Sequence, residues 1–532
     1  MTGIIAMAQQ TNPARNLVNP FIGTGGHGHT FPGACVPNGL VQLSPDTRPD
    51  GYMDWDGCGG YHYSDSVIYG FSHTHLSGTG VADLCDVLLM PMSGAASFDP
   101  SVYRSSFQHK NEEAHAGYYR VWLDEEKTLA EVTATAHCGV HRYTMPADKE
   151  QFLVLDLNHR DKLLGHSIRK EGLEIVGERR SGSWARDQRL FFCIRIGRSG
   201  GPVGIGLELN ADSTRGSINV KREDTSAIIV KVGISAVSIE GARKNLDAEV
   251  PHWDFDKVRG EAEAAWNTKL NKIQVEGGTR EQQRIFYTAL YHSYVAPYIF
   301  NDVDGQYRGM DGEVHYADHN VYTVFSLWDT FRGLHPLMTI LEPDMTSDWI
   351  KTFLLHYQQG GRLPVWELWG NETDCMIGYH SVSVIADAYM KGIRGFDERL
   401  ALKAMMEGAR LDHFGLKAYQ ERGFMSSEDG AESVSRTLEY AYDDACIAAF
   451  AARLERIGGD DQQLDFRTRS ASWRHLFDRS SGFFRARRNG GLAPGFDPYE
   501  VNFNFTEANA WQYSLFVPQD IDGLVAAHGG PE

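Results

Sequence analysis

The stretches IIVKVGISA (residues 228–236) and FDKVRGEAEAAWNTKLNKI (residues 255–273) decide the fold class, because the hydrophobic period changes between them. In the first stretch apolar residues alternate with the others at a period of two, which is typical of a β-strand. In the second, Val258, Ala262 and Trp266 recur on one side of a 3.6-residue period, which predicts an amphipathic helix. The sequence therefore predicts strands before about residue 250 and helices after it.

The same two periods extend outward along the chain. Before residue 250, short β-branched and aromatic runs predict a β-sandwich: GYYRVWL, EVTATAHCGV and QFLVLDL. After residue 250, Thr279 and Gln282 have the spacing of a capping box that begins a helix. Later helical patterns alternate with long loops rich in glycine and tryptophan, which suggests an α/α toroid. The prediction is a multi-domain β + α chain: a β-sandwich domain over 15–250, a connecting helix over 251–278 and a toroid over 279–532.

Composition limits the classes of ligand. With 42% hydrophobic residues, the 532-residue chain has an ordinary globular composition, and its formal net charge of −19 argues against a nucleic acid or an anionic membrane as the main partner. No apolar run approaches the roughly 20 residues that span a bilayer. The seven cysteines form no CxxC pair, so no zinc ribbon is indicated. The N-terminal MTGIIAMAQQ resembles the tail of a signal peptide.

Two histidine pairs raise the question of a metal. His27 and His29, like His73 and His75, are spaced to put two imidazoles on one side of an extended segment. Neither pair has a third ligand at a telling spacing. We therefore interpret both pairs as structural or sugar-contacting histidines rather than as metal ligands.

Two loops combine aromatic rings with carboxylates. SLWDTFRG contains Trp328 and Asp329, and LPVWELWGNETDCMIGYH contains Glu372. Aromatic faces stack on the C–H surfaces of sugars, while carboxylates accept hydrogen bonds from vicinal hydroxyls. The alternative for the first loop is a helix start with Asp329 as its cap and Trp328 buried, and the second loop has the same ambiguity.

FNFTEANAWQY, residues 503–513, sets one carboxyl, Glu507, among four aromatic rings. Thr506 is a candidate cap for a short helix, with Glu507 in its first turn. Burial against Phe503, Phe505 and Trp511 would favour the protonated form that a general acid needs. The alternative is a glutamate that only caps the helix.

A series of motifs resembles glycoside hydrolase family 92. It comprises NPFIGTGGHGHTFPGACVPNGLVQLSPDTR, WDGCGGYHYSDSVIYGFSHTHLSGTG, FSLWDTFRG, WGNETDCMIGYHSVSVIADAYMKGI, ESVSRTLEYAYDDACIA and FTEANAWQY, which run in the family's order from Asn19 onward. The resemblance implies a calcium-dependent, inverting exo-α-mannosidase that removes terminal mannose from oligosaccharides or N-glycans and is secreted or periplasmic. It also implies an N-terminal β-sandwich followed by an (α/α)6 toroid.

The resemblance assigns roles to individual residues. Glu507 matches the general acid, and Trp328 with Asp329 match residues that hold the terminal mannose. Trp55, Asp56 and Glu372 are placed near the pocket by the loops that contain them. No calcium ligand is identified.

The family's general base belongs to a Gly-Asn-Asp-Asp run downstream of the acid motif, which these 532 residues do not contain. The toroid is therefore expected to be incomplete in this chain. The alternative function is a mannose-binding fragment that does not hydrolyse its ligand.

Overall fold

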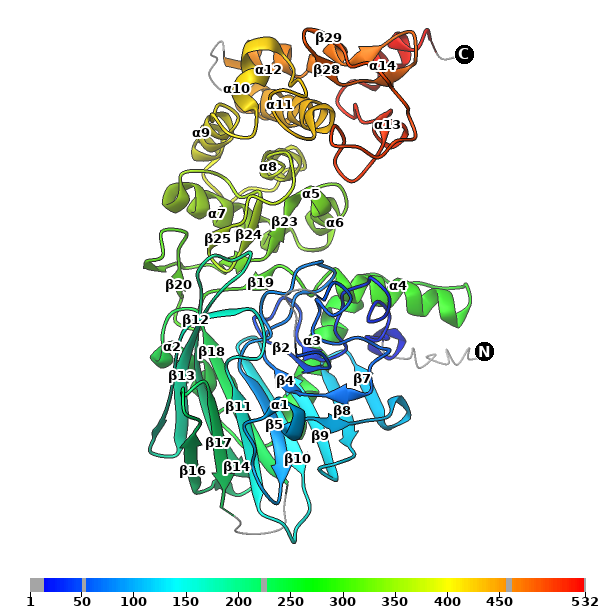
Figure 1. Ribbon diagram of the computed structural model, residues 1–532. Coiled ribbons are helices and arrows are strands. Elements are labelled where there is room, and N and C mark those ends of the chain that lie inside the picture. Colours follow the sequence, from blue (N-terminus) through cyan, green and yellow to red (C-terminus); the bar gives the residue numbers. More distant parts are fainter. Residues whose placement is uncertain (1–13, 50–53, 222–226, 456–461, 531–532) are drawn as a thin grey trace, which may run out of the picture. The chain divides into compact units, whose positions relative to one another are not determined.

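The structure is a computed structural model that describes residues 14–49, 54–221, 227–455 and 462–530 (Figure 1). The stretch that resembles part of a signal peptide lies outside these residues. By its internal contacts the chain divides into two compact units. The first contains residues up to 308 with 314–323 and 369–371, and the second contains 309–313, 324–368 and 372–532.

Two antiparallel sheets dominate the first unit (Figure 1). One has the order β1 (Ala34–Cys35), β2 (Gln42–Asp46), β4 (Gly70–Ser72), β5 (Leu88–Ser93), β11 (Gln151–Asp156), β17 (Arg215–Val220) and β16 (Ile205–Leu209). The other has the order β12 (Lys162–Glu171), β13 (Glu174–Gly182), β14 (Gln188–Arg198), β18 (Ile228–Ser235), β10 (Cys138–Thr144), β9 (Thr128–Ala134), β8 (Tyr118–Leu123) and β7 (Glu112–His115), with β15 (Gly201–Pro202) paired to β14.

The sheets pack face to face, as the alternating patterns predict. Phe71 of β4 lies 6.4 Å from the ring of His141 and 6.3 Å from the ring of Tyr143, both on β10. Within the stretch 228–236, residues 228–235 form strand β18, which is buried along its whole length. This burial arises because helix α2 (Ile239–Glu249) covers the outer face of the sheet at β14 and β18. A strand that alternates in sequence is thus buried on both faces.

Most of the stretch 255–273 forms helix α3 (Phe255–Leu270). The apolar face of this helix, with Val258, Ala262 and Trp266, is buried. The indole N–H of Trp266 donates to the carbonyl of Cys35 at 2.6 Å. Helix α4 (Arg280–His292) begins with the predicted capping box of Thr279 and Gln282. The remaining elements of this unit are η1 (Ala14–Leu17), β3 (Val67–Ile68), α1 (Pro100–Tyr103), β6 (Ser105–Ser106), η2 (His109–Asn111), β19 (Tyr298–Ile299), β20 (Gln306–Arg308), β21 (Val314–Tyr316) and β22 (Tyr322–Thr323).

The second unit is mainly helical (Figure 1). Its longest helix, α11 (Ser433–Glu455), packs against α8 (Ser381–Met390), α9 (Glu398–Gly408) and α12 (Gln462–Arg469). Its other elements are β23 (Phe325–Ser326), α5 (Leu327–Thr330), α6 (Leu334–Leu341), α7 (Pro343–Gly360), β24 (Trp366–Leu368), β25 (Asn371–Glu372), α10 (Leu416–Arg422), η3 (Ser472–His475), β26 (Phe477–Asp478), β27 (Phe483–Phe484), β28 (Arg487–Arg488), β29 (Gly491–Leu492), α13 (Ala510–Tyr513) and α14 (Ile521–Ala527). The predicted class, a sheet-rich part followed by a helical part, is confirmed.

Within the described residues, no helix combines the length and the apolar character needed to cross a membrane.

Candidate functional site

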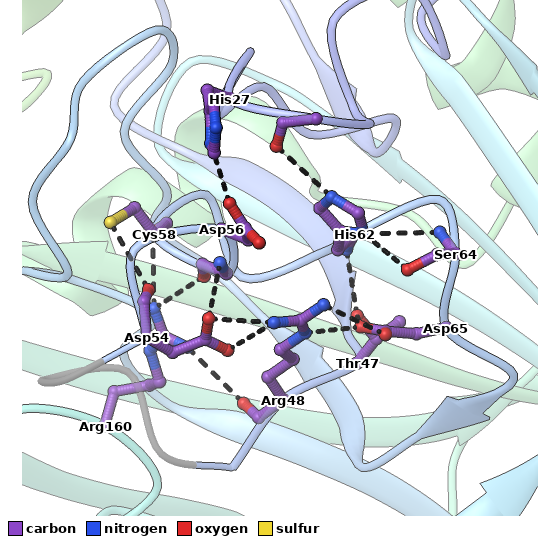
Figure 2. Close-up of polar contacts among 12 residues, drawn as sticks. His27, Thr47, Arg48, Asp54, Asp56, Cys58, His62, Ser64, Asp65 and Arg160 are labelled. Atoms are coloured by element: carbon purple, nitrogen blue, oxygen red, sulfur yellow. Dashed lines mark hydrogen bonds and ion pairs between the residues drawn. The ribbon is translucent and has the colours of Figure 1, made fainter.

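In the first unit, the loop that carries Trp55 and Asp56 is fixed by ion pairs and by bonds to its backbone. The guanidinium of Arg48 binds the carboxylate of Asp54 at 2.7 Å and that of Asp65 at 2.8 Å (Figure 2). On the far side of the loop, Arg160 donates to the carbonyls of Gly57 and Cys58. The backbone on both sides of Trp55 and Asp56 is therefore held in place.

Trp55 presents an open ring to a cavity of about 970 Å³, which is also lined by Trp184 and Asp161. The Trp55 side chain is 57% exposed, and its ring meets His29 edge to face at 4.8 Å. Gly80 makes this position possible, because a Cβ at residue 80 would lie 2.2 Å from the indole. A large exposed ring at the edge of a polar cavity suits a sugar face.

The carboxylate of Asp56 is paired with a neighbouring histidine, His27. Its carboxylate lies 2.8 Å from Nδ1 of His27 (Figure 2), and it is not among the residues that line the cavity of Trp55. Trp184, which does line that cavity, was not predicted from the sequence. It lies in a loop between strands, where its single aromatic ring gives no pattern that could have indicated it.

In the second unit, Trp328 and Asp329 lie on the four-residue helix α5. Asp329 does not cap this helix: it is exposed, and its carboxylate accepts a hydrogen bond from Ser326. Trp328 is half-buried rather than buried, with the guanidinium of Arg332 5.2 Å from its ring. The alternative prediction for this loop, in which Asp329 caps the helix and Trp328 is buried, is therefore wrong.

The local structure predicted around Glu507 is wrong. The helix begins at Ala510 with a capping box of Asn509 and Gln512, so Glu507 lies before the helix rather than in its first turn. Its backbone adopts a φ of 49°, and its side chain is exposed. Phe503 is 89% exposed, so the ring does not cover the carboxyl. Asn509 caps the helix because its side chain accepts a hydrogen bond from the backbone N–H of Gln512 at 3.2 Å.

The segment before Glu507 is bound to the beginning of α11. The backbone N–H of Val434 donates to the carbonyl of Asn504 at 3.0 Å, and the backbone N–H of Thr506 donates to the hydroxyl of Ser435 at 2.9 Å. These bonds set the position of Glu507 without burying it.

Besides burial, the negative charges of Glu507 and Asp329 both raise the pKa of the Cys375 thiol. Burial is the main cause that raises the pKa of Cys375 to about 11, and the negative charges of Asp329, Glu507 and Glu432 contribute to the rise. Glu507 and Asp329 are 178 positions apart in sequence, and both carboxyls are thus within electrostatic range of Cys375.

A buried polar network that the sequence analysis missed lies behind Trp328. The carboxylate of Glu439 accepts from the indole N–H of Trp328 at 3.1 Å and from the hydroxyl of Tyr513 at 2.8 Å. His380 contacts Glu439 at 2.7 Å with one ring nitrogen and Asp443 at 2.9 Å with the other. Glu439 and Asp443 are four residues apart on α11, and this spacing, which puts both carboxylates on one face, was the available signal.

This network carries charge. Burial acts to lower the pKa of His380, but the carboxylates of Asp443 and Glu439 outweigh it and raise the pKa to about 9. The imidazole is therefore protonated at neutral pH and holds both carboxylates in place. Since Phe331 stacks on the ring of His380 at 4.0 Å, the network also supports the loop of α5 from below.

Glu372 is used within its own loop. Its carboxylate accepts hydrogen bonds from the backbone N–H groups of Val365, Trp366 and Asp374 at 2.8–3.0 Å. Three amide bonds to one carboxylate fix the turn that follows β24. Its carboxylate is thus occupied by backbone groups of its own loop.

Calcium prefers several oxygen ligands. Among the described residues, one group of three or more His, Cys, Asp and Glu side chains has its ligand atoms within 4.8 Å of one another: Asp46, His75 and Cys85. A thiol and an imidazole do not suit calcium. Within the described part of the chain, the carboxylates around Glu507 form no such group.

Comparison with known proteins gives consistent results along the chain. A model of the glycosyl hydrolase family 92 N-terminal domain matches residues 17–235, and a model of the family 92 catalytic domain matches residues 241–532. A protein of Arthroderma benhamiae described as an uncharacterized secreted glycosidase is 26% identical, over 98% of this chain and 73% of that protein.

Solved structures agree. A family 92 α-mannosidase from Bacteroides thetaiotaomicron, also solved in complex with mannoimidazole, is 35% identical with a TM-score of 0.89, over 98% of this chain and 73% of that one. An inverting mannosidase of the same family and organism is 29% identical with a TM-score of 0.88, over 98% and 73% of the two chains. Since the two family models span nearly all of the sequence, the chain belongs to glycoside hydrolase family 92.

Proposed function

We propose that this chain is the sugar-binding and acid-bearing part of an inverting exo-α-mannosidase that releases terminal mannose from glycans. The main support is a contact between the two predicted motifs: Glu439 accepts hydrogen bonds from Trp328, beside Asp329, and from Tyr513, in the motif that contains Glu507. The chain is also 35% identical to an α-mannosidase. The mannoimidazole complex of that relative supports mannose as the sugar.

The residues have distinct tasks. Glu507 donates a proton to the oxygen of the departing group, and its exposure leaves it free to reach a bound glycoside. Asp329 accepts hydrogen bonds from sugar hydroxyls, and the half-buried indole of Trp328 supplies a face for the ring. Glu439 acts through Trp328 by fixing the orientation of the indole. In an inverting reaction a second carboxylate about 6.5–9.5 Å from the acid activates the water.

Calcium dependence and secretion are further parts of the proposal. Calcium rests on the family resemblance, and no ligand is assigned to it. Secretion rests on the relative that is described as a secreted glycosidase.

The test is a panel of aryl glycosides assayed with the complete protein that contains this chain. The α-mannoside should be hydrolysed, and the α-glucoside and α-galactoside should be poor substrates. On an α-mannoside with a poor leaving group, Glu507→Gln should lose most of the activity, whereas Glu500→Gln, which changes an exposed carboxyl in the same loop, should keep it. Mannose binding without hydrolysis of any mannoside would point instead to a sugar-binding protein, and equal hydrolysis of all three sugars would refute mannose specificity.

A further inference from the structure

Three side chains of the first unit place metal-ligating atoms close together in its core. Asp46 ends strand β2, His75 follows strand β4, and Cys85 precedes strand β5. The carboxylate oxygen, the imidazole nitrogen and the sulfur lie within 4.8 Å of one another. Asp46 and His75 are fully buried, and Cys85 is 2% exposed. The third ligand that the histidine spacing lacks in sequence is thus supplied by neighbouring strands.

Nε2 of His75 faces three polar groups at once, whereas Nδ1 faces one. Nδ1 lies 2.7 Å from the carbonyl oxygen of Gln42, so Nδ1 carries a hydrogen. Nε2 faces the carboxylate of Asp46 at 2.7 Å, the hydroxyl of Ser72 at 3.1 Å and the sulfur of Cys85. One N–H can point at only one of these atoms. An imidazole held at Nδ1 by a backbone carbonyl, with Nε2 directed at a thiol and a carboxylate, is the arrangement of a metal-ligating histidine.

A second observation comes from His159. Its Nε2 lies 3.0 Å from the other carboxylate oxygen of Asp46. Both atoms are buried, and neither makes a well-formed hydrogen bond. His159 also lines the cavity of about 970 Å³ beside Trp55. His159 therefore connects this cavity with the carboxylate of Asp46 and places a second imidazole nitrogen beside it.

We propose that Asp46, His75 and Cys85 bind a divalent transition metal, and that Zn²⁺ is the ion whose ligand preference they match. Sulfur, imidazole nitrogen and carboxylate oxygen are the usual zinc donors, and neither calcium nor magnesium takes a thiolate. On binding, the Cys85 thiol loses its proton to solvent and the sulfur bonds to the metal. The ion would tie together β2, β4 and β5 and does not depend on the glycosidase assignment.

Cobalt is the probe, because Co²⁺ takes zinc sites and a Co²⁺–thiolate bond absorbs in the near ultraviolet. The complete protein is produced with Co²⁺ in the medium and, separately, refolded with Co²⁺. One bound cobalt with a thiolate absorption band is expected. Cys85→Ala should lose the band, while Cys193→Ala, which removes a buried cysteine from the other sheet, should keep it.

A variant outside the three proposed ligands, with its thermal denaturation measured as the check on folding, separates metal binding from folding. His159→Gln leaves all three proposed ligands in place, so the cobalt band should persist while the rate at which a chelator removes the ion rises. Absence of bound cobalt after both preparations, or a thiolate band that survives Cys85→Ala, would overturn the proposal. A protein that melts at the same temperature with and without bound Zn²⁺ would also contradict it, because an ion that binds only the folded state raises the melting temperature.

Discussion

Glu507 is the proposed proton donor, and its environment differs from the one that the sequence predicts. The rings of FNFTEANAWQY do not enclose it, because Asn509 rather than Thr506 caps the helix and Phe503 points outward. Replacing the carboxyl by an amide, Glu507→Gln, removes a proton donor of nearly the same shape. We expect hydrolysis of mannosides with poor leaving groups to fall by about 10²–10⁴-fold, whereas substrates whose leaving group needs little protonation are spared. Equal losses on both would contradict a general acid.

Asp329 should behave differently, because its proposed role is to hold sugar hydroxyls and not to transfer a proton. Asp329→Ala should weaken hydrolysis of both kinds of substrate alike. Unchanged kcat/KM for both would remove Asp329 from the site.

Gly80 tests the position of Trp55. A methyl group at residue 80 would collide with the indole at 2.2 Å, so Gly80→Ala should displace the ring and raise KM for mannosides. Gly25→Ala, where the nearest atom would lie 3.7 Å away, is the matched control and should leave KM unchanged. A normal KM in Gly80→Ala would show that Trp55 contributes nothing to binding.

At the scale of elements, α11 joins the acid loop to the loop of Trp328. Its first turn binds the backbone of residues 504–506, and Glu439 accepts the indole N–H of Trp328. Glu439→Ala removes one carboxylate from a buried protonated imidazole, which typically costs about 3–5 kcal/mol of the free energy of unfolding. It should also raise KM, because Trp328 loses its orienting partner. Glu421→Ala, on the exposed side of α10, should change neither quantity, and a Glu439→Ala protein with normal stability would contradict the network.

The network also predicts a pH dependence. The folded pKa of His380 is raised from 6.5 to about 9, so its contribution to stability is fully present below pH 6.5 and is lost as the pH rises through 9. The destabilisation caused by His380→Gln should therefore be larger at pH 6.5 than at pH 9.5, by at most about 3 kcal/mol. Chemical denaturation at the two pH values measures the difference. A destabilisation that grows with pH would mean that His380 is neutral in the folded protein.

The elements differ in how far the sequence predicts them. The strand at 228–236, the helix from Phe255 and the capping box of Thr279 follow from local periods and local bonds, and all three are present. The network of Glu439, His380 and Trp328 joins residues 59 and 111 positions apart, and no local pattern contains such a contact. From the sequence alone, a glutamate such as Glu439 on a helix is expected to face solvent. In the structure it is 1% exposed.

For the whole molecule, the family match extends over both the sheet-rich and the helical parts, so the mannosidase proposal concerns the full chain. Calcium dependence can be tested at this scale. Removal of calcium with a calcium-selective chelator should abolish hydrolysis, and added Ca²⁺ should restore it. Full activity in the chelated protein would exclude a calcium requirement, whatever the fate of an ion at Cys85.

Proton NMR during hydrolysis of an α-mannoside with a poor leaving group shows which anomer of mannose the complete protein releases first. We expect β-mannose first, with the α-anomer growing only as fast as mutarotation allows, and release lowered by about 10²–10⁴-fold in Glu507→Gln. Initial release of α-mannose would contradict inversion, and undiminished release by Glu507→Gln would contradict the assignment of the acid.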